Sequence, residues 1–221
     1  MCTRIILVWH GQTEWNRVER FRGRANVPLN ATGLAQADAT GQKVAALWQP
    51  AAIYASPLVR ALSTAEAITW HVAQRQGIHR IVQVCPGLID IDYGQWQGLT
   101  PEEARQRWPQ EVEAWYETPE NARIPGGETL DDLRRRGLAA VEELAARHAE
   151  QTIVLVGHTV INRVILLAVL GLGNDRFWRL HQDTCAINVF DAEGGRAEQQ
   201  IRYTIITLND ICHLQAVQAA T

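Results

Sequence analysis

The chain has 221 residues, of which 47% are apolar and 20% are charged. These values are typical of a globular protein with a sizeable core and exclude an intrinsically disordered chain. The formal net charge of −3 gives no reason to expect nucleic acid or an anionic membrane surface as a partner. An anion site in this protein therefore has to come from a local group of arginines.

The cysteines and the apolar runs bear on the cellular compartment. The four cysteines lie far apart and include no CxxC pair, which favours reduced thiols. The apolar run near the N-terminus is too short for a signal peptide, and the longest run, residues 164–172, is too short to span a bilayer. We expect a soluble, cytoplasmic protein without a membrane partner. The sequence does not reveal the oligomeric state and is compatible with a homodimer.

Short apolar runs rich in β-branched residues predict strands at 4–9, 51–56, 80–85 and 152–157. Most of them are apolar throughout, as expected when both faces of a parallel strand are buried. Two late segments, 184–191 and 200–208, are separated by AEGGR and predict an antiparallel hairpin at the edge of the sheet.

Longer segments with helical periodicity alternate with these strands. Their apolar faces are marked by Leu34, Ala37, Val44 and Trp48, with an end before Pro50; by Ala61, Ala65, Ile68 and Val72; by Leu130, Leu133, Leu138, Val141 and Leu144; and by a run from His158 through Leu170. The alternation predicts an α/β fold with three layers, in which helices flank a mostly parallel central sheet. We expect a single domain over residues 1–221.

Residues 99–127 form a polar and aromatic excursion that is long for a connection. Such a segment is either a lid or binding loop, or a small helical subdomain on the surface. The eight tryptophans of the chain, several of them near 96–116, are compatible with an apolar or aromatic leaving group and equally with core packing.

The carboxyl ends of the predicted strands carry the candidate site, because ligands of parallel α/β sheets bind at that edge. His10 follows the first strand, Arg60 the second, Asp90 the third and His158 the fourth. Taken singly, each has a structural explanation as a loop, helix-surface or turn residue. Their coincidence on one edge favours a functional site. The other five histidines are expected to have no catalytic role.

Other site types fit the sequence poorly. It contains no GxxxxGK[ST], GxSxG or HExxH motif. No two candidate ligands stand at i, i+3 or i, i+4 on one element, so we expect no metal site. A nucleophilic histidine acting on phosphate fits best, because cations can neutralise the phosphoryl oxygens while an acid protonates the leaving oxygen.

The motifs resemble those of the histidine phosphatase superfamily, which includes the cofactor-dependent phosphoglycerate mutases. HGQTEWN and FRGRANVPLNATGLAQA match the opening of that family, and SPLVRALSTAEAI, LIDIDYGQWQG, PGGET and VGH follow in order. The resemblance covers nearly the whole chain and implies a phosphoglycerate mutase-like fold.

The same resemblance implies roles for the residues at the strand ends. His10 becomes phosphohistidine, and His158 and Arg60 hold the phosphoryl oxygens. Asn16 and the backbone of residues 22–23, that is Arg22 and Gly23, assist them. The implied substrate is a small phosphorylated metabolite, and no cofactor is implied.

Two residues depart from the family pattern. Asp90 stands where a glutamate usually donates the proton, and it reaches roughly 1.5 Å less far; Glu128 is the other candidate donor. Trp9 replaces the arginine that usually precedes the nucleophile. Loss of a charged donor from such a clamp typically costs about two to three orders of magnitude in rate. Arg22 is a candidate either for supplying part of the missing charge or for binding the rest of the substrate.

Three functions remain open at this point. The first is a phosphatase for a small phosphate monoester, with reduced activity because of Trp9. The second is a phosphoglycerate mutase, which the short 99–125 segment disfavours, since family mutases carry a longer insertion there. The third is an impaired relative that binds a phosphorylated ligand or a partner without turnover. We expect the first.

Overall fold

The computed structural model describes residues 2–77, 79–194 and 201–218. The strands of the described part are β1 Cys2–Trp9, β2 Ala52–Ala55, β3 Val82–Val84, β4 Thr152–Gly157, β5 Ile187–Glu193 and β6 Arg202–Asp210. The helices are α1 Glu14–Arg17, α2 Ala31–Leu47, α3 Val59–Gln76, α4 Pro101–Arg107, α5 Pro109–Glu117, α6 Leu130–Arg147, α7 Thr159–Val169 and α8 Gln215–Gln218. Short 3₁₀ helices span Pro86–Leu88, Gly94–Trp96, Asn174–Arg179 and Cys212–Leu214.

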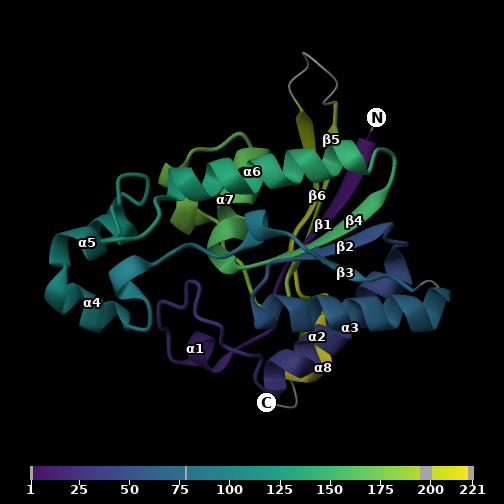
Figure 1. Ribbon diagram of the computed structural model, residues 1–221, viewed down its shortest axis with the longest axis horizontal. Helices are drawn as coiled ribbons and strands as arrows, with labels where there is room; N and C mark the ends of the chain where they lie inside the picture. Colours follow the sequence, from purple (N-terminus) through teal and green to yellow (C-terminus); the bar gives the residue numbers. More distant parts are fainter. Residues whose placement is uncertain (1, 78, 195–200, 219–221) are drawn as a thin grey trace.

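The strands form one six-stranded sheet in the order β3-β2-β4-β1-β5-β6. Strands β1 to β4 pair in parallel, and β5 and β6 complete the sheet as an antiparallel hairpin. The predicted α/β class and mostly parallel sheet are therefore confirmed (Figure 1). The predicted hairpin is also present, although its connection, residues 195–200, lies outside the described residues.

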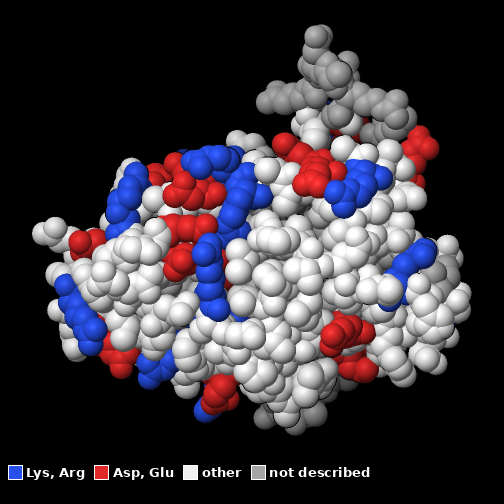
Figure 2. Space-filling view, viewed as in Figure 1, with Lys and Arg blue, Asp and Glu red and all other residues white. Residues whose placement is uncertain are grey.

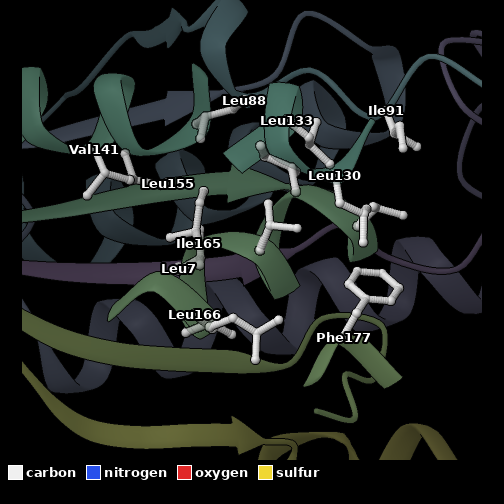
Figure 3. Close-up of a cluster of buried hydrophobic side chains, with 14 of the residues drawn as sticks. Leu7, Leu88, Ile91, Leu130, Leu133, Val141, Leu155, Ile165, Leu166 and Phe177 are labelled. Atoms are coloured by element: carbon white, nitrogen blue, oxygen red, sulfur yellow. The ribbon is translucent and has the colours of Figure 1, made fainter. Parts of the chain in front are cut away.

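Side-chain alternation along the strands divides the core into two layers. Ile5 and Leu7 of β1 pack with residues of α6 and α7 on one face of the sheet. Ile6 and Val8 pack with α2 and α3 on the other face. Figure 3 shows the first layer, in which Leu7 and Leu155 of the sheet lie near Leu133 of α6 and Ile165 of α7.

The third predicted strand is shorter and less buried than expected. Only Val82–Val84 is extended, and Ile81 beside it is 87% exposed. The reason is position, because β3 pairs with β2 alone and forms one edge of the sheet. A run of β-branched residues predicts a strand but does not show whether a second neighbour covers it.

The predicted burial was wrong for two large residues on the helix faces. Leu34 is 56% exposed, and Leu138 is only partly buried. The other large residues assigned to these two helices, such as Val44 and Leu133, are buried, but small residues occupy the closest contacts with the neighbouring helices. A Cβ on Gly41 of α2 would lie 2.7 Å from the backbone of α3, and one on Gly137 of α6 would lie 2.6 Å from Ile161 of α7. The helices approach too closely there for a leucine.

The excursion 99–127 contains α4 and α5, which project from one end of the sheet (Figure 1). It is thus helical, and it also contributes Pro101, Trp115 and Tyr116 to the wall of a cavity. On the face shown in Figure 2, the described acidic and basic side chains are interspersed, and neither sign forms a continuous surface. Among the described residues, no helix has both the length and the apolarity needed to cross a bilayer.

Candidate active site

His10 and His158 follow neighbouring parallel strands and lie at the same level of the sheet edge. Trp9 of β1 is in register with Gly157 of β4, and the amide N–H of His10 donates to the Gly157 carbonyl at 3.2 Å. The two imidazole centroids are 5.0 Å apart. Both side chains are fully buried. Strand register alone therefore brings together two histidines that are 148 positions apart in the sequence, by their numbers 10 and 158.

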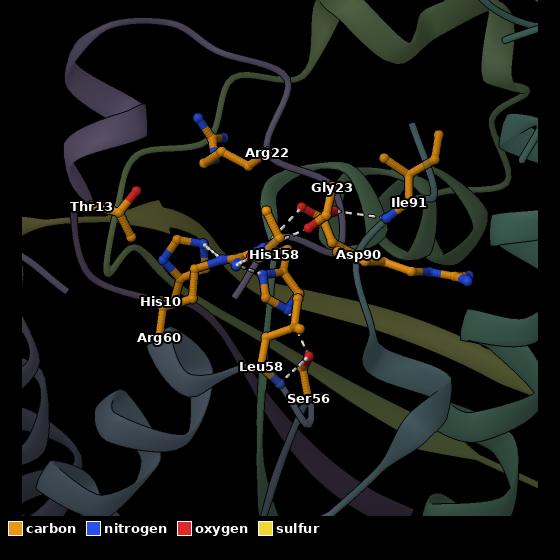
Figure 4. Close-up of polar contacts among 12 residues, drawn as sticks. His10, Thr13, Arg22, Gly23, Ser56, Leu58, Arg60, Asp90, Ile91 and His158 are labelled. Atoms are coloured by element: carbon orange, nitrogen blue, oxygen red, sulfur yellow. Dashed lines mark hydrogen bonds and ion pairs between the residues drawn. The ribbon is translucent and has the colours of Figure 1, made fainter. Parts of the chain in front are cut away.

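Arg60 joins the two rings from the first turn of α3. Its Nε donates to Nε2 of His10 at 3.1 Å and to Nδ1 of His158 at 3.2 Å (Figure 4). Its Nη1 and Nη2 donate to the carbonyls of Ala25 and Gly23, at 2.6 and 2.8 Å. Burial lowers the pKa of Arg60 to about 10, although the charge of Asp90 opposes this. The guanidinium thus remains charged at neutral pH.

The hydrogen-bond partners assign the tautomer of each ring. Nδ1 of His10 lies 2.6 Å from the carbonyl of Gly11, which can only accept, so the lone pair is on Nε2. Nδ1 of His158 accepts from Arg60, so its Nε2–H donates to Oγ of Ser56 at 2.7 Å. Burial, reinforced by the charge of Arg60, lowers the pKa of both histidines well below 6.5. Both rings are therefore neutral at pH 7.

The chain is closely packed behind the first histidine. A Cβ at Gly11 would lie only 2.4 Å from the carbonyl oxygen of Gly33, near the start of α2. Glycine at position 11 thus lets the segment that follows β1 pass directly against that helix, while the carbonyl of Gly11 stays available to His10.

Asp90 approaches the same cluster from the loop that follows β3. Its Oδ1 accepts from the amide of Ile91 at 3.0 Å, and its Oδ2 lies 3.6 Å from Nη2 of Arg60. Only 2% of the residue is exposed. Burial raises the pKa of Asp90, while the charges of Arg60 and Arg22 oppose the rise. The protonated form of Asp90 is consequently more populated near neutral pH than that of an ordinary aspartate.

Glu128 lies in a different environment. Its carboxylate accepts from Nε of Arg136 at 3.1 Å and from the amide of Asp92 at 3.0 Å, and it pairs with Arg24 at 3.1 Å. Burial acts to raise the pKa of Glu128, but these donors outweigh it and lower the pKa. Glu128 is therefore an ionised carboxylate that ties loops together. Asp92 also pairs with Arg24, at 3.2 Å.

A cavity of about 370 Å³ lies close to the histidines, although His10, His158 and Arg60 do not themselves line it. Its wall includes Trp9 and Thr159, the chain neighbours of His10 and His158, together with Asp90. Strand alternation places Trp9 on the same face as Leu7, and its indole Nε1 is buried without a hydrogen-bond partner in the described part of the chain. The residue that departs most from the family motif thus faces the cavity.

The remaining predicted residues differ in their availability to a ligand. Arg22 lines the cavity, and within the ranges described its buried Nε has no partner. Asn16 also lines it, but its Oδ1 accepts from Oγ1 and the amide of Thr13 in the cap of α1. The carbonyl of Gly23 accepts from Arg60. Gly23 therefore orients the arginine, and a direct role of its backbone in phosphate binding stays a prediction.

Two residues of this region were not predicted from the sequence. Ser56 is the first residue after β2 and holds Nε2 of His158, so the strand-end rule that selected the histidines could have found it. Arg163 lines the cavity from the second turn of α7. The sequence offered one signal for it, namely its place in the helix predicted to follow His158. In the described ranges, no three His, Cys, Asp or Glu side chains are grouped as metal ligands.

The chain matches known proteins over almost its whole length. Residues 5–203 match the family model of the histidine phosphatase superfamily, branch 1. Phosphoserine phosphatase 1 of Hydrogenobacter thermophilus is 33% identical over 211 residues, which cover 96% of this chain and 94% of that protein.

Solved structures give the same result. Bacillus stearothermophilus YhfR is 28% identical with a TM-score of 0.86, covering 96% of this chain and 100% of that one. A mycobacterial glucosyl-3-phosphoglycerate phosphatase is 28% identical with a TM-score of 0.81, covering 95% and 99%. Together with the paired histidines at the sheet edge, these matches show that the chain belongs to the histidine phosphatase superfamily.

Proposed function

We propose that this protein hydrolyses a small phosphate monoester through a phosphohistidine formed on Nε2 of His10. The observation that carries the proposal is the assigned tautomer of His10. Its Nδ1–H is held by the Gly11 carbonyl, and the Nε2 lone pair points at the buried guanidinium of Arg60. A neutral imidazole in that state is a competent nucleophile towards phosphorus. The relatives named as phosphatases support the reaction class.

In the first step, Nε2 attacks phosphorus and the bond from phosphorus to the ester oxygen breaks. Asp90 gives its proton to that oxygen, and the alcohol leaves. The rise in the pKa of Asp90 caused by burial favours the protonated acid that this step needs. The Gly11 carbonyl stabilises the ring as it becomes cationic, because it accepts from Nδ1–H.

Arg60 and Arg22 neutralise the phosphoryl oxygens, on which charge spreads in the transition state. His158 needs one further change to assist them, because its Nδ1 is an acceptor in the free protein. A bound dianion favours protonation of His158, since an opposite charge stabilises the cation. Nδ1 then carries a hydrogen and donates to the phosphoryl group.

In the second step, water attacks the phosphohistidine while the Asp90 carboxylate accepts a proton from it. The bond from phosphorus to Nε2 breaks, and orthophosphate leaves with His10 neutral again. Trp9 supplies one neutral N–H where the family pattern has an arginine. We therefore expect lower activity on simple monoesters than that pattern would give.

The test is a rapid quench into alkali with an ester labelled in its phosphoryl group, since phosphohistidine survives alkali. Wild type is expected to carry label, and His10→Ala is expected to carry none and to lose turnover. Near wild-type turnover by His10→Ala overturns the proposal. Conversion of 3-phosphoglycerate to 2-phosphoglycerate faster than phosphate release would identify a mutase. Phosphate binding without label or turnover would identify a binding protein.

A further inference from the structure

Among the described residues, Arg163 is, after Arg22, a second cation in the cavity wall that forms no ion pair, whereas Arg20 pairs with Glu103. It lies on α7, five residues after His158, and lines the same cavity as Trp9 and Arg22. Its guanidinium carbon lies over the rings of Phe177 and Trp178, 5.2 Å from each centroid. Aromatic faces stabilise a cation, but they leave its N–H donors without acceptor atoms.

No group in the described part of the chain accepts a hydrogen bond from the Arg163 guanidinium. Nε of Arg163 is buried without a hydrogen-bond partner, and the residue forms no ion pair with any described carboxylate. By contrast, Arg20, Arg24, Arg60 and Arg136 each lie within 4.0 Å of one. Burial lowers the pKa of Arg163, yet a guanidinium stays charged at neutral pH. Arg163 is partly buried, and a partly desolvated cation without an acceptor is costly, so a ligand that supplies an anion would be bound favourably.

Arg163 is separate from the phosphoryl clamp. The charges of Arg60 and Arg22 act on His10, where they reinforce the lowering of its pKa by burial. The charge of Arg163 acts on Tyr93, as does the charge of Arg22, and both oppose the rise in the pKa of Tyr93 caused by burial. Arg22 and Arg163 thus both reach Tyr93, but of these two only Arg22 also acts on His10.

Aromatic rings line the cavity around this second cation. Tyr93, Trp115, Tyr116 and Trp178 all contribute to its wall. Tyr116 of α5 stacks on Trp178 with centroids 5.3 Å apart and planes inclined by 22°. Nε1 of Trp178 is already used, because it donates to the carbonyl of Trp115 at 2.7 Å. These rings therefore offer mainly apolar surface to a ligand.

We propose that the leaving group of the substrate carries a carboxylate that binds Arg163, on a planar or apolar body that packs against these rings. The planar fork of a guanidinium fits a carboxylate through two parallel hydrogen bonds. Arg163 then determines specificity by anchoring the leaving group, while His10 and Arg60 act on the phosphoryl group. The hydrolysis of such a substrate rests on the proposed phosphatase function, whereas the binding of its carboxylate by Arg163 does not.

The test compares two esters that differ in one charge: 4-(carboxymethyl)phenyl phosphate and its neutral 4-(carbamoylmethyl)phenyl analogue. Wild type is expected to prefer the acid in kcat/KM by about tenfold or more, as for a charge-assisted hydrogen bond. Arg163→Met should bring the ratio close to unity, and Arg163→Lys should keep part of it. The matched control is Arg105→Met, which removes the same charge from an exposed position on α4 that pairs with Glu102.

The outcomes separate this inference from the proposed function. Equal kcat/KM for the two esters in wild type, or a preference that survives in Arg163→Met, overturns the inference while phosphatase activity stands. If neither ester is hydrolysed, the proposed function fails, and the same ratio is then measured as Kd by calorimetry with His10→Ala. Thermal unfolding of each variant shows whether it is folded. If Arg163→Met does not fold, the comparison is made with Arg163→Lys.

Discussion

Arg60 donates through Nε to Nε2 of His10 across 3.1 Å, so the buried cation contacts the nitrogen that we propose as the nucleophile. The contact disfavours protonation of His10, because a neighbouring positive charge destabilises the imidazolium. In the proposed mechanism, the same contact places the guanidinium where the transferred phosphoryl group arrives. One arginine would then prepare the nucleophile before binding and meet the phosphoryl oxygens after it.

The first prediction concerns the acid. Asp90→Asn should slow hydrolysis of alkyl or phenyl phosphates far more than that of p-nitrophenyl phosphate, whose leaving group needs little protonation. The measurement is the ratio of kcat/KM for the two kinds of ester in wild type and variant. Equal losses on both would mean that another group donates the proton.

The pH dependence follows from the directions of two pKa shifts. His10 must be neutral, and its pKa lies well below 6.5, so activity falls on the acid side only after the pH drops through that lowered value. Asp90 must be protonated, and burial raises its pKa, so activity falls as the pH rises through the raised value. With phenyl phosphate, wild type should show both limbs of the profile. Part of the fall in activity at high pH comes from titration of the substrate phosphate itself. Asp90→Asn should lose the remaining part of that fall. An unchanged pH profile in this variant would contradict the role of Asp90 as the acid.

Glu128→Gln provides the contrasting case. Glu128 pairs with Arg136 and Arg24 from a partly buried position, and its pKa is lowered on balance. Its contribution to stability is therefore present above the unfolded pKa and is lost as the pH falls through the folded value. The variant should lose about 1–3 kcal/mol of unfolding free energy at pH 7, and less at low pH. Denaturant unfolding at both pH values tests this. Loss of the alkaline limb in this variant would instead make Glu128 the acid.

The strand-end argument predicted much of the site because it depends on topology alone. Parallel strands whose carboxyl ends share one edge must bring His10 and His158 together once β1 and β4 are neighbours. The same argument applied to β2 would have selected Ser56. Arg163 could not be found in this way, since its role depends on the aromatic rings of Phe177 and Trp178 from a distant segment.

Helix periodicity predicted where the helices lie and most of the side chains that they bury, such as Val44, Ile68 and Leu133, but it also assigned Leu34 and Leu138 to the buried faces. The pattern counts large apolar residues, whereas closely packed helices need small ones at their contacts. Gly41 and Gly137 occupy such contacts, while Leu34 is largely exposed. Hydrophobicity along one chain carries no information about how near the next helix lies, nor about whether a strand such as β3 lies at the edge of the sheet.

Ser56 is predicted to be a positioning residue for His158. Its hydroxyl accepts from Nε2 at 2.7 Å and so keeps Nδ1 directed at Arg60. Ser56→Ala should weaken inhibition by vanadate and lower kcat/KM by roughly tenfold, in the range of losses when a supporting hydrogen bond is removed. Ser56→Thr keeps the hydroxyl and should restore most of both. A loss of thermal stability without any change in vanadate affinity would show that the residue has only a structural role.

The last prediction concerns Trp9, whose indole lies in the cavity wall with its Nε1 unpaired within the described chain. We expect the indole to be a neutral replacement in a phosphate pocket. Trp9→Arg should therefore raise kcat/KM for simple monoesters by roughly tenfold or more and tighten inhibition by phosphate and vanadate. Trp9→Phe keeps an aromatic ring but removes the N–H, and it should weaken anion binding.

Arg22 also lines this cavity and would repel a second guanidinium. If the two cations compete for one place, the gain should be larger in Trp9→Arg combined with Arg22→Gln. All four proteins are compared on one ester at one pH, with thermal unfolding as the check on folding. If neither arginine variant gains activity or anion affinity over wild type, position 9 does not act on the phosphoryl group.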